Sequence, residues 1–390
     1  MKKVKIKRLL VFFGIVIGLC FAGYRWATPL TRNTLKKELL HSAHILNSKW
    51  SKSISKANDG YQAKFNSPTL LVDDIFGSMK GPATSNTFLL NEKEEELYWI
   101  TGLNVSANVE DKNQEDANDF VCHVNFDHSQ IEHFSRFDLE ERINLQIPQL
   151  ITLTKGGLDF DFPEGFGYPI FSNEKIVLGT QALNLNDKSA FFKIDYDFVL
   201  SFQKDKEKRL KPLYMRYVIL SLPYDENDLE HQDRESMYSD SKVRCVITRG
   251  NNLGFNGVNA KGEPITSFWK VPKGKHTYRS AFEEYIKLDT IMTLHKINSH
   301  VHPYSESIEL RDITADSTVF KSLVTNKQDK IGLREITSFS SVKGVKLYPD
   351  HKYEIVQEVN NTSEGEIEMM GSMFLYFYDH KLDKKLRSIL

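Results

Sequence analysis

Short runs of strand-forming residues, separated by polar stretches, fill the chain beyond about residue 70. β-branched and aromatic residues dominate these runs, and charged or turn-forming residues interrupt them. No long helical pattern lies between successive runs, as it would in the βαβ units of a parallel sheet. The pattern predicts an all-β protein of antiparallel β-sandwich, or jelly-roll, domains. The expected strands cover residues 96–105, 120–126, 175–183, 190–202, 213–222, 242–248, 285–295, 300–312, 318–324, 344–347, 353–359 and 369–378.

The length of 390 residues indicates two domains, each large enough to bury its own core. Residues 203–212 and 223–241 are rich in charge and are typical of loops near a domain boundary. The expected order is an N-terminal membrane anchor or signal at residues 1–30, an amphipathic helix and connector at 31–70, a first β-sandwich at 71–225 and a second β-sandwich at 226–390.

The N-terminus carries the pattern of a membrane or export signal. Five basic residues between positions 2 and 8 precede an uncharged run over residues 9–24, and Arg25 follows. The basic end should stay cytoplasmic, and the rest should reach the exported side, which is the periplasm or cell surface if the chain is bacterial. The run is shorter than a bilayer span of about 20 residues, but residues 26–30 can extend it. A retained transmembrane signal-anchor is favoured because the sequence around Cys20 is a poor cleavage site; secretion after cleavage is the alternative.

A helical pattern follows the N-terminal segment. Apolar residues recur every three to four positions over residues 34–54, with charged residues between them. This spacing predicts a short amphipathic helix that packs on the first domain. Its apolar positions are Leu35, Leu39, Ala43, Leu46, Trp50 and Ile54.

The composition narrows the classes of partner and of covalent framework. The chain has 51 basic and 52 acidic residues and no nucleic-acid-binding motif, so nucleic acid is not expected as a partner. Cys20 lies in the apolar N-terminal run, which leaves Cys122 and Cys245 for the folded part. That number is too small for a disulfide-framework protein, and one bridge between these two residues stays open.

The pair His300 and His302 is the first candidate for chemistry. Residues two apart in a strand project from the same face, so both imidazoles should converge, as copper and zinc sites require. Met370 opens a later strand-like run, and its thioether is a soft ligand that suits Cu(I). Alternation places Met369 and Met373 on the opposite face of that strand. The alternative is a solvated histidine pair and a core methionine.

Several segments together resemble the copper type II, ascorbate-dependent monooxygenases, the family of peptidylglycine α-hydroxylating monooxygenase and dopamine β-monooxygenase. The likeness is spread over most of the chain. It is carried by residues 98–102 (Tyr-Trp-Ile-Thr-Gly), 121–124 (Val-Cys-His-Val), 166–168 (Phe-Gly-Tyr), 179–183 (Gly-Thr-Gln-Ala-Leu) and 211–213 (Lys-Pro-Leu), and by His300, His302 and Met370. The resemblance implies two β-sandwich domains and copper as the cofactor. It also implies that His300, His302 and Met370 hold the second copper, which is the site of dioxygen activation.

The first copper site of that family is incomplete in this chain. The family uses three histidines there, two adjacent and one distant, whereas this chain has Cys122 and His123 for the pair and Leu183 or Asn184 for the third. The resemblance therefore implies a degenerate first site, and a buried thiol beside a core histidine is the alternative. The arginine with which peptide-hydroxylating members grip a carboxylate is replaced by Asn298, so peptide amidation is rejected.

The predicted function is that of an exported copper-binding protein. As an enzyme it would be a copper-dependent monooxygenase that hydroxylates a C–H bond with dioxygen, and it would draw electrons from an external donor. The sequence does not define the small-molecule or surface substrate. The alternative is a non-catalytic two-sandwich protein for copper binding or for protein or glycan contact at the cell surface. Two further histidines, His128 and His133, are expected in a surface loop within residues 127–141.

Overall fold

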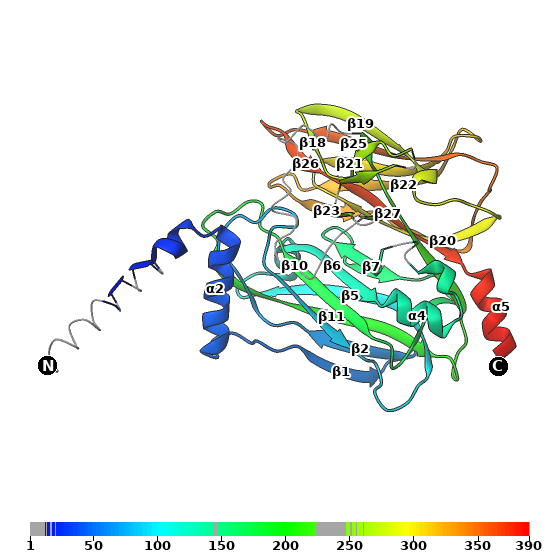
Figure 1. Ribbon diagram of the computed structural model, residues 1–390, viewed down its shortest axis with the longest axis horizontal. Helices are drawn as coiled ribbons and strands as arrows, with labels where there is room; N and C mark the ends of the chain where they lie inside the picture. The colour runs from blue at the N-terminus through cyan, green and yellow to red at the C-terminus, as the bar shows by residue number, and fades with distance from the viewer. Residues whose placement is uncertain are drawn as a thin grey trace.

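The protein consists of two β-rich halves that lie against each other (Figure 1). In this computed structural model the described residues are 12, 14–15, 18–19, 21–143, 145, 147–223, 247–249, 252–254, 256–259 and 261–389. Strands dominate both halves and form several sheets. The prediction of a mostly β protein is therefore confirmed.

Two sheets pack face to face in the half that we call the first sandwich. One has the strand order β1-β2-β11-β5-β9, and the other has the order β4-β10-β6-β7. Their inner faces share one core, to which Phe65 and Phe198 contribute from the first sheet and Val124 and Phe126 from the second. The strands are β1 (Ser51–Lys56), β2 (Tyr61–Asn66), β3 (Leu70–Val72), β4 (Ala83–Phe88), β5 (Leu97–Val109), β6 (Val121–His128), β7 (Gln149–Thr154), β8 (Asp159–Asp161), β9 (Phe166–Phe171), β10 (Ile176–Ala182) and β11 (Phe192–Lys204).

Strand β11 shows how the sequence builds this core. Tyr196, Phe198 and Leu200 are fully buried, whereas Asp197 and Val199 between them are partly exposed. This alternation follows from the two-residue period of a strand. Burial of each large apolar side chain stabilises the fold by about 1.5–3 kcal/mol, so the register of β11 is fixed by the core.

The second sandwich is built in the same way. Strands β27, β20 and β24 form one sheet, and β19-β25-β21-β22-β23 form the facing sheet. Leu294 and Leu375 from the first sheet share a core with Ile308 and Ile355 from the second. The strands that follow β11 are β12 (Lys211–Ile219), β13 (Leu222–Pro223), β14 (Ile247–Arg249), β15 (Asn252–Gly254), β16 (Asn256–Val258), β17 (Pro264–Thr266), β18 (Trp269–Val271), β19 (Gly274–Ala281), β20 (Met292–Val301), β21 (Ser305–Asp312), β22 (Ser317–Asn326), β23 (Leu333–Ile336), β24 (Phe339–Leu347), β25 (Tyr353–Asn361), β26 (Ile367–Met369) and β27 (Gly371–Tyr378).

Strand β12 joins the two sandwiches. It pairs antiparallel with β27 from Leu213, opposite Tyr378, to Ile219, opposite Ser372. Its first two residues also pair parallel with β9 of the first sandwich. One hydrogen-bonded path therefore runs from β1 to β24 through both halves. The division into domains at residues 225 and 226 stays a prediction, and β12, which precedes it, pairs mainly with the second half.

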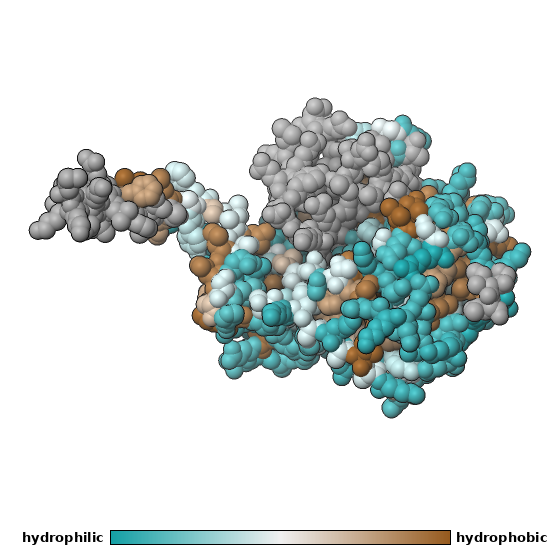
Figure 2. Space-filling view, turned by 60° about the horizontal axis from the view of Figure 1, so that its bottom comes forward, coloured by the Kyte–Doolittle hydropathy of each residue, from teal (hydrophilic) through white to brown (hydrophobic). Residues whose placement is uncertain are grey.

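The predicted amphipathic helix is wrong beyond residue 42, because α2 covers only Pro29–Ser42. His44 has a φ of 56°, a left-handed conformation that ends a helix. Residues 51–56, which the connector was expected to include, instead form β1 and pair with β2. Figure 2 shows hydrophobic surface where the N-terminal helical segment meets the first sandwich. The remaining helices are α3 (Gln114–Asn118), α4 (Gln130–Arg136), α5 (His380–Ile389) and the 3-10 turns η1 (Glu140–Arg142) and η3 (Phe282–Glu284).

The expected strand over residues 300–312 is two strands. β20 ends at Val301 and β21 begins at Ser305. Pro303 has no N–H to continue a ladder, and Tyr304 takes a φ of 73°, so the chain turns between them. The strand expected over residues 285–295 begins only at Met292. Most of the strand expected over residues 242–248 lies outside the described residues.

The N-terminal membrane anchor stays a prediction. Within the described part of the chain, no helix is both long enough and apolar enough to cross a bilayer. The basic residues at positions 2–8 and several residues of the apolar run, Cys20 among them, lie outside that part.

Helix α5, at the C-terminal end, packs on the first sandwich as well as on β12 and β27. Leu382 and Leu386 share a cluster with Trp99 and Phe134. Just before the helix, Asp379 accepts two hydrogen bonds from the Arg142 guanidinium. The C-terminal helix therefore contacts the N-terminal half of the molecule (Figure 1).

A single buried hydroxyl tests the contact between the halves. Tyr376 Oη, on β27, donates a hydrogen bond of 2.8 Å to the Leu150 carbonyl of β7. Tyr376→Phe leaves that buried carbonyl without its partner and should lower the free energy of unfolding by about 1–2 kcal/mol in urea denaturation. Tyr61→Phe removes a surface hydrogen bond to Glu207 and should change stability little. Equal effects of the two substitutions would contradict this account.

Candidate metal centre

The face of β20 that carries the histidine pair is turned toward the first sandwich. His300 lies opposite Ser372 of β27, and Val301 lies opposite Gly371, so His302 follows directly after the strand ends. Asn298, on the same face as His300, donates a hydrogen bond of 2.8 Å to the Thr152 carbonyl of β7. Both histidines are buried, and their ring centroids are 5.6 Å apart.

The methionines of the later strand divide between the two faces. Met369 and Met373 belong to the core of the second sandwich. Met370 instead packs with Ile219 in a separate small cluster, which Phe268 also contacts. The Phe268 ring lies 5.9 Å from the ring of His302, centroid to centroid. Met370 is therefore outside the second core and shares a neighbour with the histidine pair.

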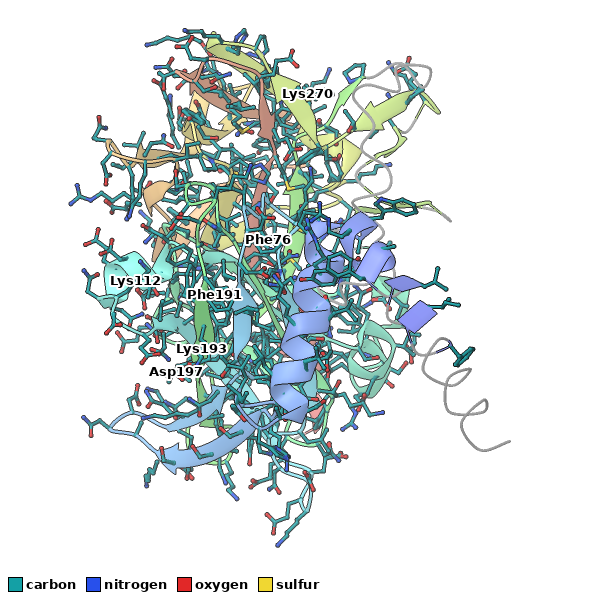
Figure 3. The ribbon with its side chains drawn as sticks, turned by 90° about the vertical axis from the view of Figure 1, so that its left-hand side faces the viewer. Phe76, Lys112, Phe191, Lys193, Asp197 and Lys270 are labelled. Atoms are coloured by element: carbon teal, nitrogen blue, oxygen red, sulfur yellow. The ribbon has the colours of Figure 1, made fainter. Side chains whose placement is uncertain are left out.

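The residues expected at the first copper site lie in the same region. Cys122 and His123 are buried on β6 of the first sandwich, with 3.4 Å between the thiol sulfur and His123 Nδ1. Ser78 Oγ lies 3.8 Å from Cys122 Sγ and 3.1 Å from His302 Nε2. Phe76, two residues before Ser78, is labelled in Figure 3 near the boundary between the two halves. The sequence predicts two separate sites, whereas the structure brings both residue sets together in one Cys/His cluster: Cys122, His123, His300 and His302.

The backbone fixes which nitrogen of His302 can act as a ligand. Its Nδ1 lies 3.2 Å from the Glu368 carbonyl, which can only accept a hydrogen bond. Nδ1 therefore carries the proton, and Nε2 presents a lone pair that accepts a hydrogen bond from Ser78. A carbonyl that orients the non-ligating nitrogen in this way is common behind metal-binding histidines.

Two imidazole nitrogens of the Cys/His cluster have no partner among the described residues. They are His123 Nε2 and His300 Nδ1, and both are buried. A buried polar atom without a hydrogen bond costs about 1–3 kcal/mol, so such atoms need an explanation. A bound metal ion would explain these two nitrogens, because neutral imidazole nitrogen is a ligand for copper and zinc.

The protonation states suit metal binding at neutral pH. Burial, with a smaller effect from the charge of His302, lowers the pKa of His123 to about 4. Burial also lowers the pKa of His300 well below its usual value, and that of His302 below 6.5. These imidazoles are therefore neutral. Burial raises the pKa of the Cys122 thiol, which stays protonated until a metal displaces the proton.

A cavity of about 520 Å³ between the halves opens onto this cluster. Cys122, His300 and His302 form part of its wall. Nearby, Asp119 of the first sandwich pairs with Lys155 at 2.9 Å, and with Lys327 and Lys330 of the second at 2.7 and 2.8 Å. These ion pairs hold the two walls together.

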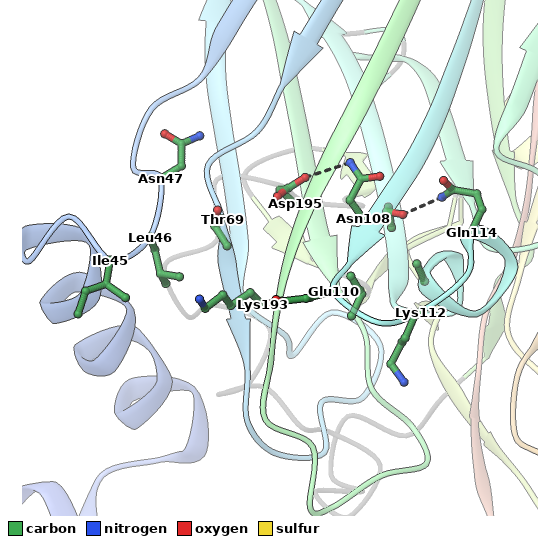
Figure 4. A pocket seen from close by; sticks show the side chains of 13 residues that line it. Ile45, Leu46, Asn47, Thr69, Asn108, Glu110, Lys112, Gln114, Lys193 and Asp195 are labelled. Atoms are coloured by element: carbon green, nitrogen blue, oxygen red, sulfur yellow. Dashed lines mark hydrogen bonds between the residues drawn. The ribbon is translucent and has the colours of Figure 1, made fainter.

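A second pocket, of about 380 Å³, lies between residues 45–47, which follow α2, and the ends of β5 and β11 (Figure 4). Asn108 and Asp195 are hydrogen-bonded to each other in its wall, and Lys193 and Glu110 lie nearby. None of its lining residues is a histidine or cysteine. It therefore has no soft ligand for copper.

Leu183 and Asn184, the two positions expected at the third ligand of the first copper site, do not provide a metal ligand. Asn184 donates hydrogen bonds to the carbonyls of Asp74 and Asp187, which fixes its amide in a structural role. Leu183 lines the large cavity but offers no donor atom. Cys122 is a free thiol, and Cys245 lies outside the described residues.

The prediction that His128 and His133 lie in a surface loop is wrong, because both are buried. His128 ends β6, and His133 lies on the inner face of α4, where Ser129 caps the helix. Phe134 and Phe137 pack beside the His133 ring. Phe134 and Phe137 lie one and four residues after His133, and apolar residues at this spacing indicate the buried face of a helix. With Glu174, these histidines form the one group in the described part of the chain whose three donor atoms lie within 4.8 Å of one another. The Cys/His cluster is looser and would have to close around a metal.

Comparisons with known proteins assign no family. No family model matches the chain, and no curated protein matches it. Among solved structures it is similar to the STIV MCP, with 9% identity, a TM-score of 0.30 and coverage of 81% of this chain and 98% of that chain. It is also similar to the major capsid protein P2 from Bacteriophage PM2, with 8% identity, a TM-score of 0.30 and coverage of 81% and 99%. Neither likeness bears on function.

The buried histidines make stability depend on pH. Since the pKa of His123 falls from about 6.5 in the unfolded chain to about 4 in the folded protein, its contribution is complete above pH 6.5 and is lost as pH falls toward 4. The loss for this residue is about 3 kcal/mol at most. Asp127 acts in the opposite sense, because burial raises its pKa to about 7.

We therefore expect His123→Gln to flatten the dependence of unfolding free energy on pH between 4 and 6.5, measured by urea denaturation with a chelator present. An unchanged slope in His123→Gln would show that this imidazole is not held neutral by burial.

Proposed function

We propose that the protein binds copper in the Cys/His cluster between its two sandwiches. The observation that carries the proposal is the pair of unpartnered buried nitrogens, His123 Nε2 and His300 Nδ1, beside the Cys122 thiol. His302 adds a nitrogen whose tautomer is set by the Glu368 carbonyl. Nitrogen and sulfur donors of this kind favour Cu(I) over the hard cations Mg²⁺ and Ca²⁺.

His300 and His302 are the central ligands of this proposal, and Met370 is its thioether ligand. The placement of Met370 outside the second core supports that role. Cys122 and His123 complete the set from the other half of the molecule. Binding would release the thiol proton of Cys122 and would require the Ser78 hydroxyl to leave His302 Nε2. The copper would then link the two sandwiches.

The cavity of about 520 Å³ provides space for a substrate beside the histidines. Copper supplies dioxygen activation in the enzymes that the chain resembles, and hydroxylation of a C–H bond is the reaction proposed here. Because Cys122 and His123 lie in one cluster with His300 and His302, these residues form no separate copper site that could supply electrons, so an external donor is part of the proposal. The same observation favours the second candidate, a non-catalytic copper carrier or surface-binding protein.

Export, the N-terminal membrane anchor and the jelly-roll connectivity of each sandwich belong to the same proposal. The basic N-terminal residues and the following apolar run support membrane attachment. With the basic end in the cytoplasm, the copper cluster would lie on the exported side. The substrate and the electron donor would then be molecules of that compartment.

Copper binding is tested on the purified full chain. Anaerobic competition with a chromophoric Cu(I) chelator, together with elemental analysis, should show about one copper per chain. His300→Ala should weaken binding by about tenfold or more because it removes a nitrogen ligand. Met370→Leu should weaken binding less, since thioether sulfur is a weak ligand.

Matched controls lie on the same strands. Met373→Leu changes a methionine of β27 that belongs to the core, and His295→Ala removes a β20 histidine that is bonded to the Ser341 carbonyl. Both variants should bind copper like the wild type. The proposal fails if the wild type binds no copper, or if His300→Ala binds it as tightly as His295→Ala.

Oxygen consumption separates the enzyme from the carrier. Copper-loaded wild type, freed of unbound metal, should consume dissolved oxygen with ascorbate as donor, and His302→Ala should not. A copper-loaded wild type that is no faster than His302→Ala would favour the carrier.

A further inference from the structure

A second buried cluster lies in the first sandwich, and none of its members belongs to the copper proposal. His128 ends β6, His133 lies on α4, Tyr168 lies on β9 and Glu174 lies in the turn between β9 and β10. All four side chains are buried. Four elements of the first sandwich thus bring two imidazoles, a phenol and a carboxyl into one place.

The donor atoms converge on one point. Tyr168 Oη lies 3.0 Å from His128 Nε2 and 3.0 Å from His133 Nε2. The two imidazole centroids are 4.5 Å apart. In a tetrahedral zinc site with bonds of about 2.0–2.1 Å, neighbouring ligand atoms are about 3.3 Å apart. Each of the two oxygen–nitrogen distances would therefore have to lengthen by only a few tenths of an ångström to admit a zinc ion.

Glu174 holds His133 in the orientation that such a site needs. Its Oε1 lies 2.8 Å from His133 Nδ1, and its Oε2 accepts a hydrogen bond of 3.2 Å from the Phe171 N–H. Both carboxylate oxygens are therefore engaged. Glu174 Oε1 accepts a hydrogen bond from the N–H at His133 Nδ1, so His133 Nε2 carries a lone pair that points toward Tyr168. A carboxylate behind a ligating histidine is the usual outer partner of a zinc site.

The cluster without a metal is not fully satisfied. Tyr168 has one proton for two imidazole nitrogens, so if His133 receives it, His128 must donate from Nε2. His128 Nδ1 is then a buried acceptor, and it has no hydrogen-bond partner among the described residues. Glu174 is also completely buried, with a neutral imidazole as its side-chain partner.

We propose that His128 Nε2, His133 Nε2 and Tyr168 Oη bind a zinc ion, with Glu174 as a positioning residue behind His133. Binding replaces the phenol O–H bond with a Zn–O bond and releases one proton to solvent. Phenolate and carboxylate then balance the two charges of the ion. The ion would tie α4 and β9 to β6 and so stabilise the first sandwich, and the site is independent of the copper proposal.

The full-length protein tests this site directly. After removal of metals by a chelator, Zn²⁺ alone is titrated against a chromophoric zinc chelator, and thermal unfolding is followed with and without Zn²⁺. We expect about one Zn²⁺ per chain and a rise in Tm of a few degrees. Tyr168→Phe and His133→Gln should each bind Zn²⁺ at least tenfold more weakly. Glu174→Gln should lower affinity about 10–100-fold while a Co²⁺-substituted sample keeps its tetrahedral visible bands.

Two controls separate the zinc site from general damage and from the copper cluster. Tyr196→Phe removes a buried hydroxyl elsewhere in the first sandwich, where it donates to the Phe120 carbonyl, and it should leave Zn²⁺ affinity unchanged. His300→Ala should also keep the Zn²⁺ affinity of the wild type, whatever it does to copper. The proposal is overturned if the wild type retains no Zn²⁺ and its Tm does not respond, or if Tyr168→Phe binds Zn²⁺ like Tyr196→Phe. The wild-type response shows that zinc binds, and its loss in Tyr168→Phe together with its retention in His300→Ala assigns it to this site. His133→Gln tests the same site independently, so one variant that does not fold leaves the result intact.

Discussion

The pairing of β12 with β27 is the interaction on which the rest of this molecule depends. It runs from Leu213 to Ile219 and makes one hydrogen-bonded path out of two sandwiches. Because β20 is the next strand in that path, its outer face is pressed against the first sandwich instead of facing water. Asn298 and Tyr376 make the resulting contacts with β7. The Cys/His cluster exists because this one ladder places β6 and β20 together.

The longest strands, such as β5, β11 and β25, were predictable from sequence, because the period-two alternation of buried and exposed residues is a local signal, whereas β1, β2, β7 and β19 were not among the expected strands. β11 is an example, with its aspartates between large apolar residues. The end of α2 was not predictable from spacing, since Trp50 continues the helical pattern while packing on Phe88 and Phe198 from outside the helix. The turn at Tyr304 did have a sequence signal, because Pro303 cannot continue a strand ladder, but the expected strand over residues 300–312 ran through it.

The sites were less predictable than the fold. Sequence patterns identify His300, His302 and Met370 as candidates, but they cannot show that Cys122, almost 180 residues earlier, shares the Ser78 hydroxyl with His302. That contact depends on how two sheets pack, not on local pattern. His128 and His133 were misplaced for a related reason, since a polar segment was read as exposed although α4 turns His133 inward. Buried histidines of this kind are held neutral by desolvation, which is costly unless a partner uses their lone pairs.

The docking of α5 on the first sandwich also affects how the protein can be made. Trp99 and Phe134 acquire Leu382 and Leu386 as neighbours only after nearly all of the chain has been synthesised. Arg142 likewise gains its ion-pair partner, Asp379, only at that late stage. A nascent chain that has completed β11 therefore still exposes an apolar surface and an unpaired guanidinium, so during synthesis the early half stays a substrate for chaperones until the C-terminal helix arrives.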